Sequence, residues 1–178
     1  MRMLALLTIF MYMNQDSSAL IYDFNNQDDS NPWYIVDDGV MGGLSEGKIT
    51  VNQAGNGVFS GYVTTENNGG FSSVRYSLDK KDVSQFTNVA IKLKGDGKDY
   101  QFRIKSDASQ RYSYVKSFTT SGDWETIRLL FKDFIPMFRG NTLNKSNYPG
   151  QVIDQVAFLI GNNRKENFDL EIEKIYLE

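Results

Sequence analysis

Beyond residue 20, hydrophobic and polar residues alternate in short runs, and Gly, Asn, Asp or Ser interrupts the alternation about every eight to twelve residues. Side chains along a strand point alternately to opposite faces of a sheet, so the pattern is typical of many short strands in a sandwich or barrel. No segment shows a sustained helical period, so we expect an all-β protein with little helix. The clearest runs are Val74–Leu78, Val89–Leu93, Tyr100–Ile104, Ile127–Phe131, Val156–Ile160 and Phe168–Ile172.

Four local features refine this pattern. The final run slips out of phase after Ile172, and a β-bulge near Glu173-Lys174 would restore it. Residues 82–86 can form one short turn of helix. We expect a strand end followed by a loop over residues 131–139, because Pro136 lies within that stretch. The polar cluster from residue 25 to residue 31 predicts a surface loop.

The N-terminus differs from the rest of the chain. Arg2 precedes an apolar stretch from Leu4 to Met13, and Ser17-Ser18-Ala19 offers small residues for cleavage. This order is typical of a secretory signal peptide over residues 1–19, and the alternative is a buried or disordered extension. We therefore expect one domain over residues 20–178, exported to the periplasm or cell envelope if the signal is cleaved and cytoplasmic otherwise. The apolar stretch is too short for a resident membrane helix, so the mature chain is expected to have no transmembrane segment.

Two absent residue types exclude much catalytic chemistry. The 178-residue chain has no Cys and no His, which removes thiolate nucleophiles, Ser-His-Asp triads and the usual zinc ligands. The net charge is −3, so no general attraction to nucleic acid is expected. We expect no cofactor and no catalytic or metal-ligating residue.

Three glycine-centred motifs stand out: Asp37-Asp38-Gly39-Val40-Met41-Gly42-Gly43-Leu44-Ser45, Asn67-Asn68-Gly69-Gly70-Phe71 and Gly95-Asp96-Gly97. Each alone is explained by a turn, since Gly supplies positive φ and Asp or Asn caps the bend. None has the spacing of a phosphate-binding loop. Their combination, with strands between them, is more specific than any single motif.

In this combination the chain resembles the complex I intermediate-associated protein 30 family, from about residue 33 to the C-terminus. The resemblance implies a galactose-binding-domain-like jelly-roll β-sandwich and, from the mitochondrial members, a chaperone-like role in the assembly of respiratory complex I. An apolar N-terminus with one Arg is not a mitochondrial transit peptide, so a bacterial member is expected. The residues that carry the resemblance are Trp33, Asp38, Met41-Gly42-Gly43, Ser45, Gly61, Gly69-Gly70-Phe71, Arg75, Gly95-Asp96-Gly97, Tyr100, Trp124, Phe134, Pro136, Arg139 and Gly140.

Strand alternation also predicts a polar sheet face. If Val74 takes the core face of its strand, Arg75 takes the other, and Arg103 does the same on its own strand. If the two strands share a sheet, both arginines project from one concave surface, where a guanidinium can grip a carboxylate or sugar hydroxyls. Tyr112 and Tyr114 could add stacking surfaces. The alternative for each arginine is a solvated strand face or a cross-strand ion pair.

Other candidates stay open at this stage. Trp33 and Trp124 can be core or edge residues or, less simply, a sugar platform. Asp37, Asp38 and Asp96 are the candidate carboxylates for glycoside hydrolysis or for a structural Ca²⁺, but each lies beside Gly or in a turn motif, where capping explains it.

Together, the sequence patterns and the resemblance predict a non-enzymatic binding protein. The first hypothesis is an assembly factor that binds a protein partner, such as subunits of a membrane complex, through the sheet face and glycine loops. The alternative is a stand-alone carbohydrate-binding module of the cell envelope, and a carbohydrate hydrolase that uses Asp residues is the third. The expected binding residues are Asp38, Gly42, Gly43, Ser45, Asn68, Gly69, Gly70, Phe71, Arg75, Asp96, Tyr100, Arg103 and Arg139.

Overall fold

The computed structural model describes residues 19–26 and 31–178. The predicted signal peptide therefore lies outside the described residues except for Ala19, which begins the first strand. Within the described residues, no helix is long and apolar enough to cross a membrane.

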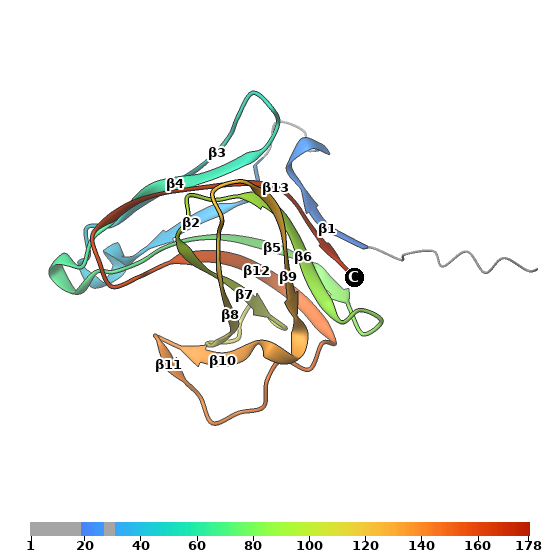
Figure 1. The fold of residues 1–178 in the computed structure, drawn as a ribbon. Coiled ribbons are helices and arrows are strands. Elements are labelled where there is room, and N and C mark those ends of the chain that lie inside the picture. The colour runs from blue at the N-terminus through green and yellow to red at the C-terminus, as the bar shows by residue number, and fades with distance from the viewer. Residues whose placement is uncertain (1–18, 27–30) are drawn as a thin grey trace, which may run out of the picture.

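Two antiparallel sheets face each other in a jelly-roll β-sandwich, which confirms the predicted fold class (Figure 1). One sheet has the order β3-β4-β13-β6-β9, with β1 also paired to β13. Its strands are β1 (Ala19–Asp23), β3 (Glu46–Val51), β4 (Gly57–Val63), β6 (Asn88–Lys94), β9 (Trp124–Leu130) and β13 (Glu166–Leu177). The other sheet has the order β11-β10-β8-β7-β12-β5-β2. Its strands are β2 (Tyr34–Asp37), β5 (Ser72–Asp82), β7 (Asp99–Lys105), β8 (Ser113–Thr119), β10 (Ile135–Phe138), β11 (Asn141–Thr142) and β12 (Val152–Ile160).

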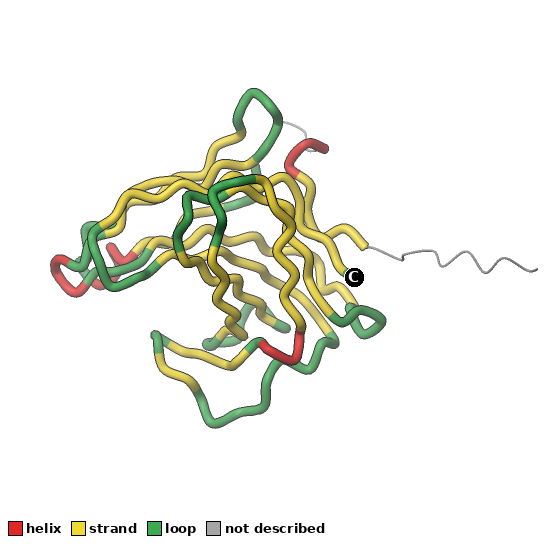
Figure 2. Tube along the Cα trace, viewed as in Figure 1, coloured by secondary structure: helices red, strands yellow, loops and turns green. Residues whose placement is uncertain are grey.

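Helix is limited, as the sequence predicted, to four short 3₁₀ segments in the described chain (Figure 2). These are η1 (Phe24–Asn26), η2 (Asp38–Met41), η3 (Glu66–Asn68) and η4 (Phe131–Asp133). Segments η2 and η3 lie together at one end of the sandwich, where backbone N–H groups that follow η3 bond to the Asp38 side chain.

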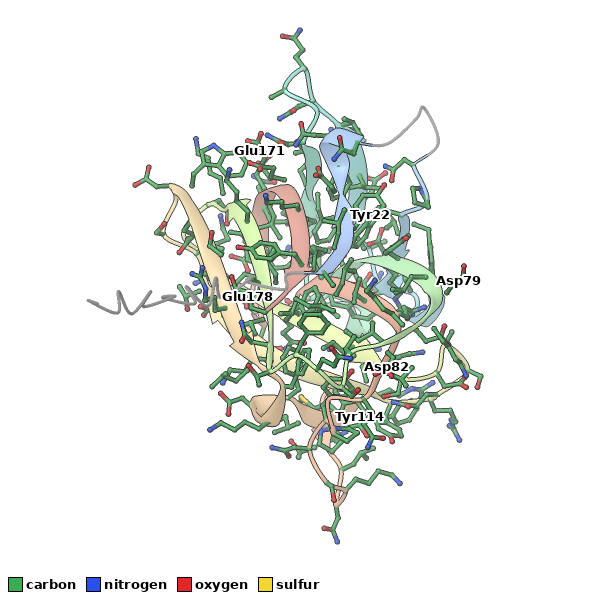
Figure 3. The ribbon with its side chains drawn as sticks, turned by 90° about the vertical axis from the view of Figure 1, so that its right-hand side faces the viewer. Tyr22, Asp79, Asp82, Tyr114, Glu171 and Glu178 are labelled. Carbon is green, nitrogen blue, oxygen red and sulfur yellow. The ribbon has the colours of Figure 1, made fainter. Side chains whose placement is uncertain are left out.

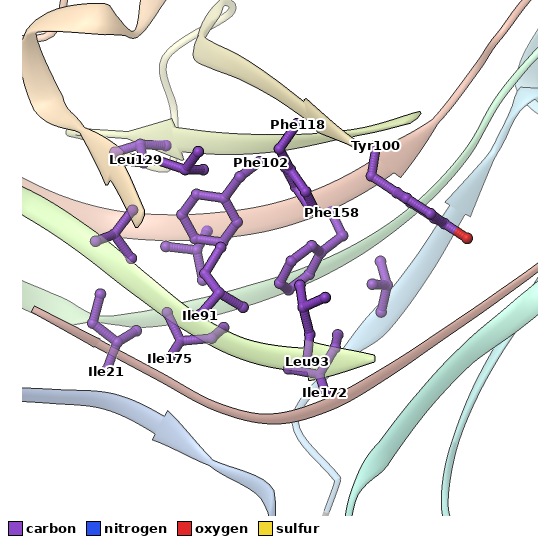
Figure 4. Close-up of a cluster of buried hydrophobic side chains, with 14 of the residues drawn as sticks. Ile21, Ile91, Leu93, Tyr100, Phe102, Phe118, Leu129, Phe158, Ile172 and Ile175 are labelled. Atoms are coloured by element: carbon purple, nitrogen blue, oxygen red, sulfur yellow. The ribbon is translucent and has the colours of Figure 1, made fainter. Parts of the chain in front are cut away.

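The core lies between the sheets and follows the alternation seen in the sequence. Val89, Ile91 and Leu93 on β6 are fully buried, and so are Phe102 and Ile104 on β7. They belong to one cluster with residues of both central strands (Figure 4). Polar side chains radiate from the outside of the sandwich (Figure 3). One apolar face per strand thus predicts which residues the two sheets bury against each other.

The last two strands of the chain lie inside their sheets. Strand β12 pairs with β5 and β7, and β13 pairs with β4, β6 and β1. The register of β13 against β6 shifts between Ile172 and Lys174, which confirms the predicted bulge. Both central strands are therefore added after every partner strand has been synthesised.

Two local predictions were wrong. Asp82, the first residue of the predicted helical turn, is instead the last residue of β5. Residues 83–86 form a single turn, in which the Phe86 N–H donates to the Val83 carbonyl (3.0 Å). The stretch after Phe131 contains η4 and then strand β10, with Pro136 inside it. Pro136 is accommodated because its strand lies near the sheet edge, between β8 and the short β11.

Candidate functional site

A continuous row of side chains crosses the outer face of the seven-stranded sheet. Directly paired residues on neighbouring strands point to the same face, so the strand register places these side chains together. The row spans six strands, or about 24 Å at the usual strand spacing of about 4.8 Å. We call it the arginine row, and its members are Tyr34, Arg75, Ala157, Arg103, Val115 and Ile135.

The centre of the arginine row is recessed. Ala157 is only 5% exposed and Val115 only 3%, although in the described structure the other sheet covers only the opposite, inner face. Their burial comes from the taller side chains beside them, including Arg75 and Arg103 on either side of Ala157. The ends of the row are open, since Tyr34 is 43% exposed. The result is a long surface whose centre has a floor of buried, small side chains.

The arginine row carries positive charge without acidic partners. Among the described residues, neither Arg75 nor Arg103 forms an ion pair. Burial, and then the charge of Arg75, lowers the pKa of Arg103 to about 10. Burial also lowers the pKa of Arg75, and burial together with Arg75 lowers the pKa of Lys105. The sheet face is thus a cluster of partly desolvated, mutually repelling cations.

Neutral polar groups surround the two arginines, whereas Lys105 also lies near Asp107. Gln101 accepts hydrogen bonds from Arg103 Nε (3.1 Å) and Nη2 (2.7 Å). The amide of Gln155, which is nearly buried, donates to the Tyr34 hydroxyl (3.0 Å) and to Ser77 Oγ (3.1 Å). These contacts hold the amide groups in fixed positions, and their remaining donors and acceptors suit a ligand rich in hydroxyl groups.

Asp38 belongs to a second cluster, and its role there is structural. The side chain is 0% exposed and accepts four hydrogen bonds. Ser45 donates through its backbone N–H (3.1 Å) and hydroxyl (2.5 Å), and the N–H groups of Gly70 (2.6 Å) and Phe71 (3.2 Å) complete the set. Desolvation raises the pKa of Asp38, but these bonds lower it further, so the net pKa lies below the usual value.

Glycine is required around Asp38 for space and for conformation. A Cβ on Gly43 would lie 2.1 Å from Asp38 Oδ1, and one on Gly69 would lie 2.7 Å from Oδ2. Gly70 has φ +144, which side chains disfavour. Gly42 likewise ends η2 with φ +86. The glycine motifs therefore bring two loops onto one carboxylate, while the nearby Asn68 is exposed with φ 61.

Asp96 and Tyr100 form a third, separate cluster. Asp96 accepts from Lys98 Nζ (2.6 Å), from the Tyr100 hydroxyl (3.0 Å) and from the Asp169 N–H (3.0 Å). Tyr100 is 1% exposed, and burial together with Asp96 raises its pKa. This cluster fastens the loop between β6 and β7 to β13.

Arg139 lies in a fourth place, at the hairpin between β10 and β11. Arg139 and Gly140 have φ of 48 and 80, as the two central residues of a type I′ hairpin turn require. The guanidinium lies 5.5 Å from the centre of the Phe138 ring, and that of Arg111 lies 5.1 Å from it. Arg139 is exposed and outside the arginine row.

Of the thirteen predicted binding residues, the arginine row contains only Arg75 and Arg103. Phe71 connects the Asp38 cluster to the sheet that carries the arginine row. Its N–H donates to Asp38, and its side chain lies beside Gly161, next to Leu159 of β12. The Asp38 cluster thereby fixes the start of β5, the strand that carries Arg75.

The aromatic candidates do not form a common stacking surface: Trp33 and Tyr114 lie in the core, and Trp124 is exposed at a sheet edge. Tyr114 is buried on the inner face, 5.2 Å from the Tyr148 ring centre, and Tyr112 contacts Tyr114, so the stacking-surface interpretation of these tyrosines was wrong. Trp33 packs in the core on Tyr76. Trp124 is 43% exposed at the start of the outermost strand β9, so it is not a core residue.

Tyr34, Ala157 and Gln155 belong to the candidate site but were not predicted from the sequence. Alternation alone gives each residue a face, but strand order and register decide which residues are neighbours. An aromatic residue at the start of the strand was the one signal in the sequence for Tyr34.

The candidate carboxylates do not form a shared centre. Asp38 is held by the first two glycine motifs and Asp96 by the loop after β6, while Asp37 Oδ2 accepts from the Gly47 N–H (3.0 Å). Within the described part of the chain, no group of three or more potential metal-ligating Asp or Glu side chains is found.

Sequence comparison assigns the chain to a family. The model of the Complex I intermediate-associated protein 30 (CIA30) family matches residues 22–172. Complex I intermediate-associated protein 30, mitochondrial, from Mus musculus is 22% identical over 187 residues, which cover 90% of this chain. The match spans 56% of the mouse protein, so this chain corresponds to about half of that relative.

Structural comparison finds carbohydrate-binding modules. A family 11 module from Clostridium thermocellum, in complex with a beta-1,3-1,4-mixed-linked tetrasaccharide, matches with a TM-score of 0.65 and 22% identity, over 90% of this chain and 94% of that one. The agarase AgWH50C matches with a TM-score of 0.57 and 11% identity, over 90% of this chain but only 24% of the enzyme. These similarities establish a shared fold.

Proposed function

The chain belongs to the complex I intermediate-associated protein 30 family, and we propose that it is a non-catalytic binding domain that holds a saccharide across the arginine row. The observation that carries the proposal is the pairing of Arg75 and Arg103 across Ala157 on a recessed face, with no acidic partner among the described residues. Most N–H groups of these two guanidiniums have no acceptor in the described structure, so they can donate hydrogen bonds to a ligand.

The chemistry of the face favours a saccharide over a protein surface. The centre of a protein interface is usually apolar and aromatic. Here the apolar side chains in the centre are small or buried, and amide and guanidinium groups stand around them. Such groups match the closely spaced hydroxyls of a sugar chain. The fold shared with carbohydrate-binding modules is consistent with this proposal.

A hydrolase is disfavoured by the same geometry. Glycoside hydrolysis needs two carboxyl groups on either side of the scissile bond. The arginine row contains no Asp or Glu, and Asp38 and Asp96 are engaged in separate loop clusters. We therefore propose binding without catalysis.

Calorimetry of the purified domain with a broad polysaccharide panel tests the proposal. We expect binding to at least one polymer, lost by tenfold or more on Arg103→Gln and retained in Lys48→Gln, which removes a charge from β3 of the other sheet. No binding across the panel would contradict a saccharide-binding role.

A chaperone-like assembly factor is the second candidate, and membership of the family favours it. Its partner would be a protein, such as a subunit of a membrane complex. Affinity capture from native membranes should then return defined subunits, and Arg75→Ala with Arg139→Ala should weaken that capture without unfolding the domain. Recovery of only general chaperones would count against it.

We also propose that the protein is exported. The basic, apolar and small-residue order of residues 1–19 supports this proposal. N-terminal sequencing of the native protein, together with its cell fraction, tests it: a mature N-terminus near residue 20 in the envelope fraction is expected, and an intact Met1 in the cytoplasm would contradict it.

A further inference from the structure

We infer that the saccharide held on the arginine row is acidic, and that Arg75 and Arg103 bind its carboxylate group. This inference rests on the proposed function and narrows it to one ligand class, the uronate-containing polysaccharides. Four observations on the sheet face carry it.

The first observation is unused donor capacity. A guanidinium has five N–H donors. Arg103 uses its Nε and one Nη nitrogen on Gln101, and the described residues offer Arg75 no hydrogen-bond acceptor at all. Exposed arginines elsewhere do find carboxylates, as Arg128 does with Glu178 and Arg164 with Glu166. Arg111 and Arg139 also lack a carboxylate partner, but both guanidiniums lie over the Phe138 ring. In the described chain, Arg75 and Arg103 have neither a carboxylate nor an aromatic ring as partner.

The second observation is electrostatic. Arg75 is close enough to Arg103 and to Lys105 to lower the pKa of both, after the larger effect of burial. Partly buried charges that repel each other raise the free energy of the unliganded protein. A bound anion removes that repulsion, whereas a neutral sugar would leave it in place.

The third observation is the contrast with the rest of the molecule. The whole chain has a net charge of −3, so this positive face is not part of a generally basic surface. A local cation cluster on an acidic protein attracts an anion to one place, and long-range attraction of this kind weakens with salt.

The fourth observation is shape. Arg75 and Arg103 are two strands apart, about 10 Å between Cα atoms at the usual strand spacing, and the buried Ala157 lies between them. A planar guanidinium pairs with a carboxylate through two parallel hydrogen bonds, which selects carboxylate by geometry as well as by charge. Gln101 and Gln155 lie on the same sheet face, on either side of the arginine row. Their remaining polar atoms are available for hydroxyl groups of the same polysaccharide.

The experiment uses matched polymers that differ only in the acid group. Polygalacturonate is compared with highly methyl-esterified pectin, and alginate with its propylene glycol ester, by calorimetry with the full chain. We expect at least one acid form to bind tenfold or more tightly than its ester, and the affinity to fall at least threefold between low and high salt.

Variants separate geometry from charge. Arg103→Lys keeps the positive charge but loses the planar guanidinium, so we expect its affinity for the acid polymer to fall several-fold. Arg103→Gln loses both, so we expect a larger fall in affinity. Lys48→Gln, with the same charge loss on the other sheet, should bind as the wild type does. Full retention of affinity in Arg103→Lys would overturn the carboxylate-fork geometry.

The remaining outcomes are distinct. Equal binding of acid and ester forms, or binding of neutral polysaccharides alone, overturns the inference and leaves the proposed saccharide function standing. Polyglutamate bound as tightly as polygalacturonate overturns the saccharide class in favour of an acidic protein segment. No binding to any polysaccharide, acidic or neutral, overturns the proposed function together with the inference.

Discussion

Ser45 donates both its backbone N–H and its hydroxyl to the carboxylate of Asp38, at 3.1 and 2.5 Å. The same hydroxyl oxygen also accepts the backbone N–H of Thr64 (3.1 Å). One serine thus fastens the end of β4 and the start of β3 to the carboxylate that holds the β5 loop. The loops at this end of the sandwich are a single hydrogen-bonded unit.

Replacing Asp38 should break that unit. In Asp38→Asn, the side-chain NH₂ group would face backbone N–H donors, so at least one buried donor loses its acceptor. We expect the free energy of unfolding to fall by about 2–4 kcal/mol. Chemical denaturation measures it, and Asp133→Asn is the control, since the half-exposed Asp133 lies 3.6 Å from Lys116 and should cost less than about 0.5 kcal/mol.

Acid should weaken the same unit. The pKa of Asp38 is lower in the folded chain than its ordinary value of 3.8, so its ionisation stabilises the fold above that pH. This contribution is lost as the pH falls below 3.8 and through the lower folded pKa. The stability difference between wild type and Asp38→Asn should therefore shrink as the pH is lowered from 5 to 2. A difference that stays constant would show that the ionised carboxylate contributes nothing.

Gly43 should be intolerant of a single methyl group. The Cβ of Gly43→Ala would meet Asp38 Oδ1 at 2.1 Å and the backbone of Gly69 at 2.8 Å, so the loops must separate. We expect a loss of about 1–3 kcal/mol. Gly39→Ala is the matched control, because no atom lies within 4 Å of a Cβ there. Equal melting temperatures for the two variants would contradict the packing described for Gly43.

Arg75 should matter for binding and not for stability. It has no hydrogen-bond acceptor among the described residues, and burial lowers its pKa. Arg75→Gln removes a partly desolvated charge and its repulsion with Arg103 while keeping a polar side chain of useful length. We expect unfolding free energy within about 1 kcal/mol of the wild type, or slightly higher. A larger loss in thermal or chemical denaturation would assign Arg75 a structural role.

The sequence predicted the fold because each strand keeps one apolar face. Val74 and Phe102 alternate with Arg75 and Arg103, so the shared polar face of the two arginines followed from counting residues, once both strands were placed in one sheet. The same counting located the bulge after Ile172. Hydrophobic alternation is a local property of each strand, so it predicted which face each residue takes and where the alternation slips.

The candidate site was harder to predict because it depends on register and loop closure. Tyr34 faces Arg75 only because β2 adds to the edge of β5, which no local pattern specifies. Asp38 and Gly70, far apart in sequence, meet through a hydrogen bond that composition cannot show. Tyr114 was assigned to a polar face although it packs on Tyr148, because a Tyr is equally compatible with either face.

The position of β12 and β13 within their sheets has a consequence for synthesis on the ribosome. Each supplies the backbone partners that join strands made much earlier, β5 to β7 in one layer and β4 to β6 in the other. Until β12 and β13 have been synthesised, the edges of five earlier strands, β1, β4, β5, β6 and β7, lack these partners. Completion of both sheets is therefore a late event in the synthesis of this domain, because the strands that join the earlier ones are made last.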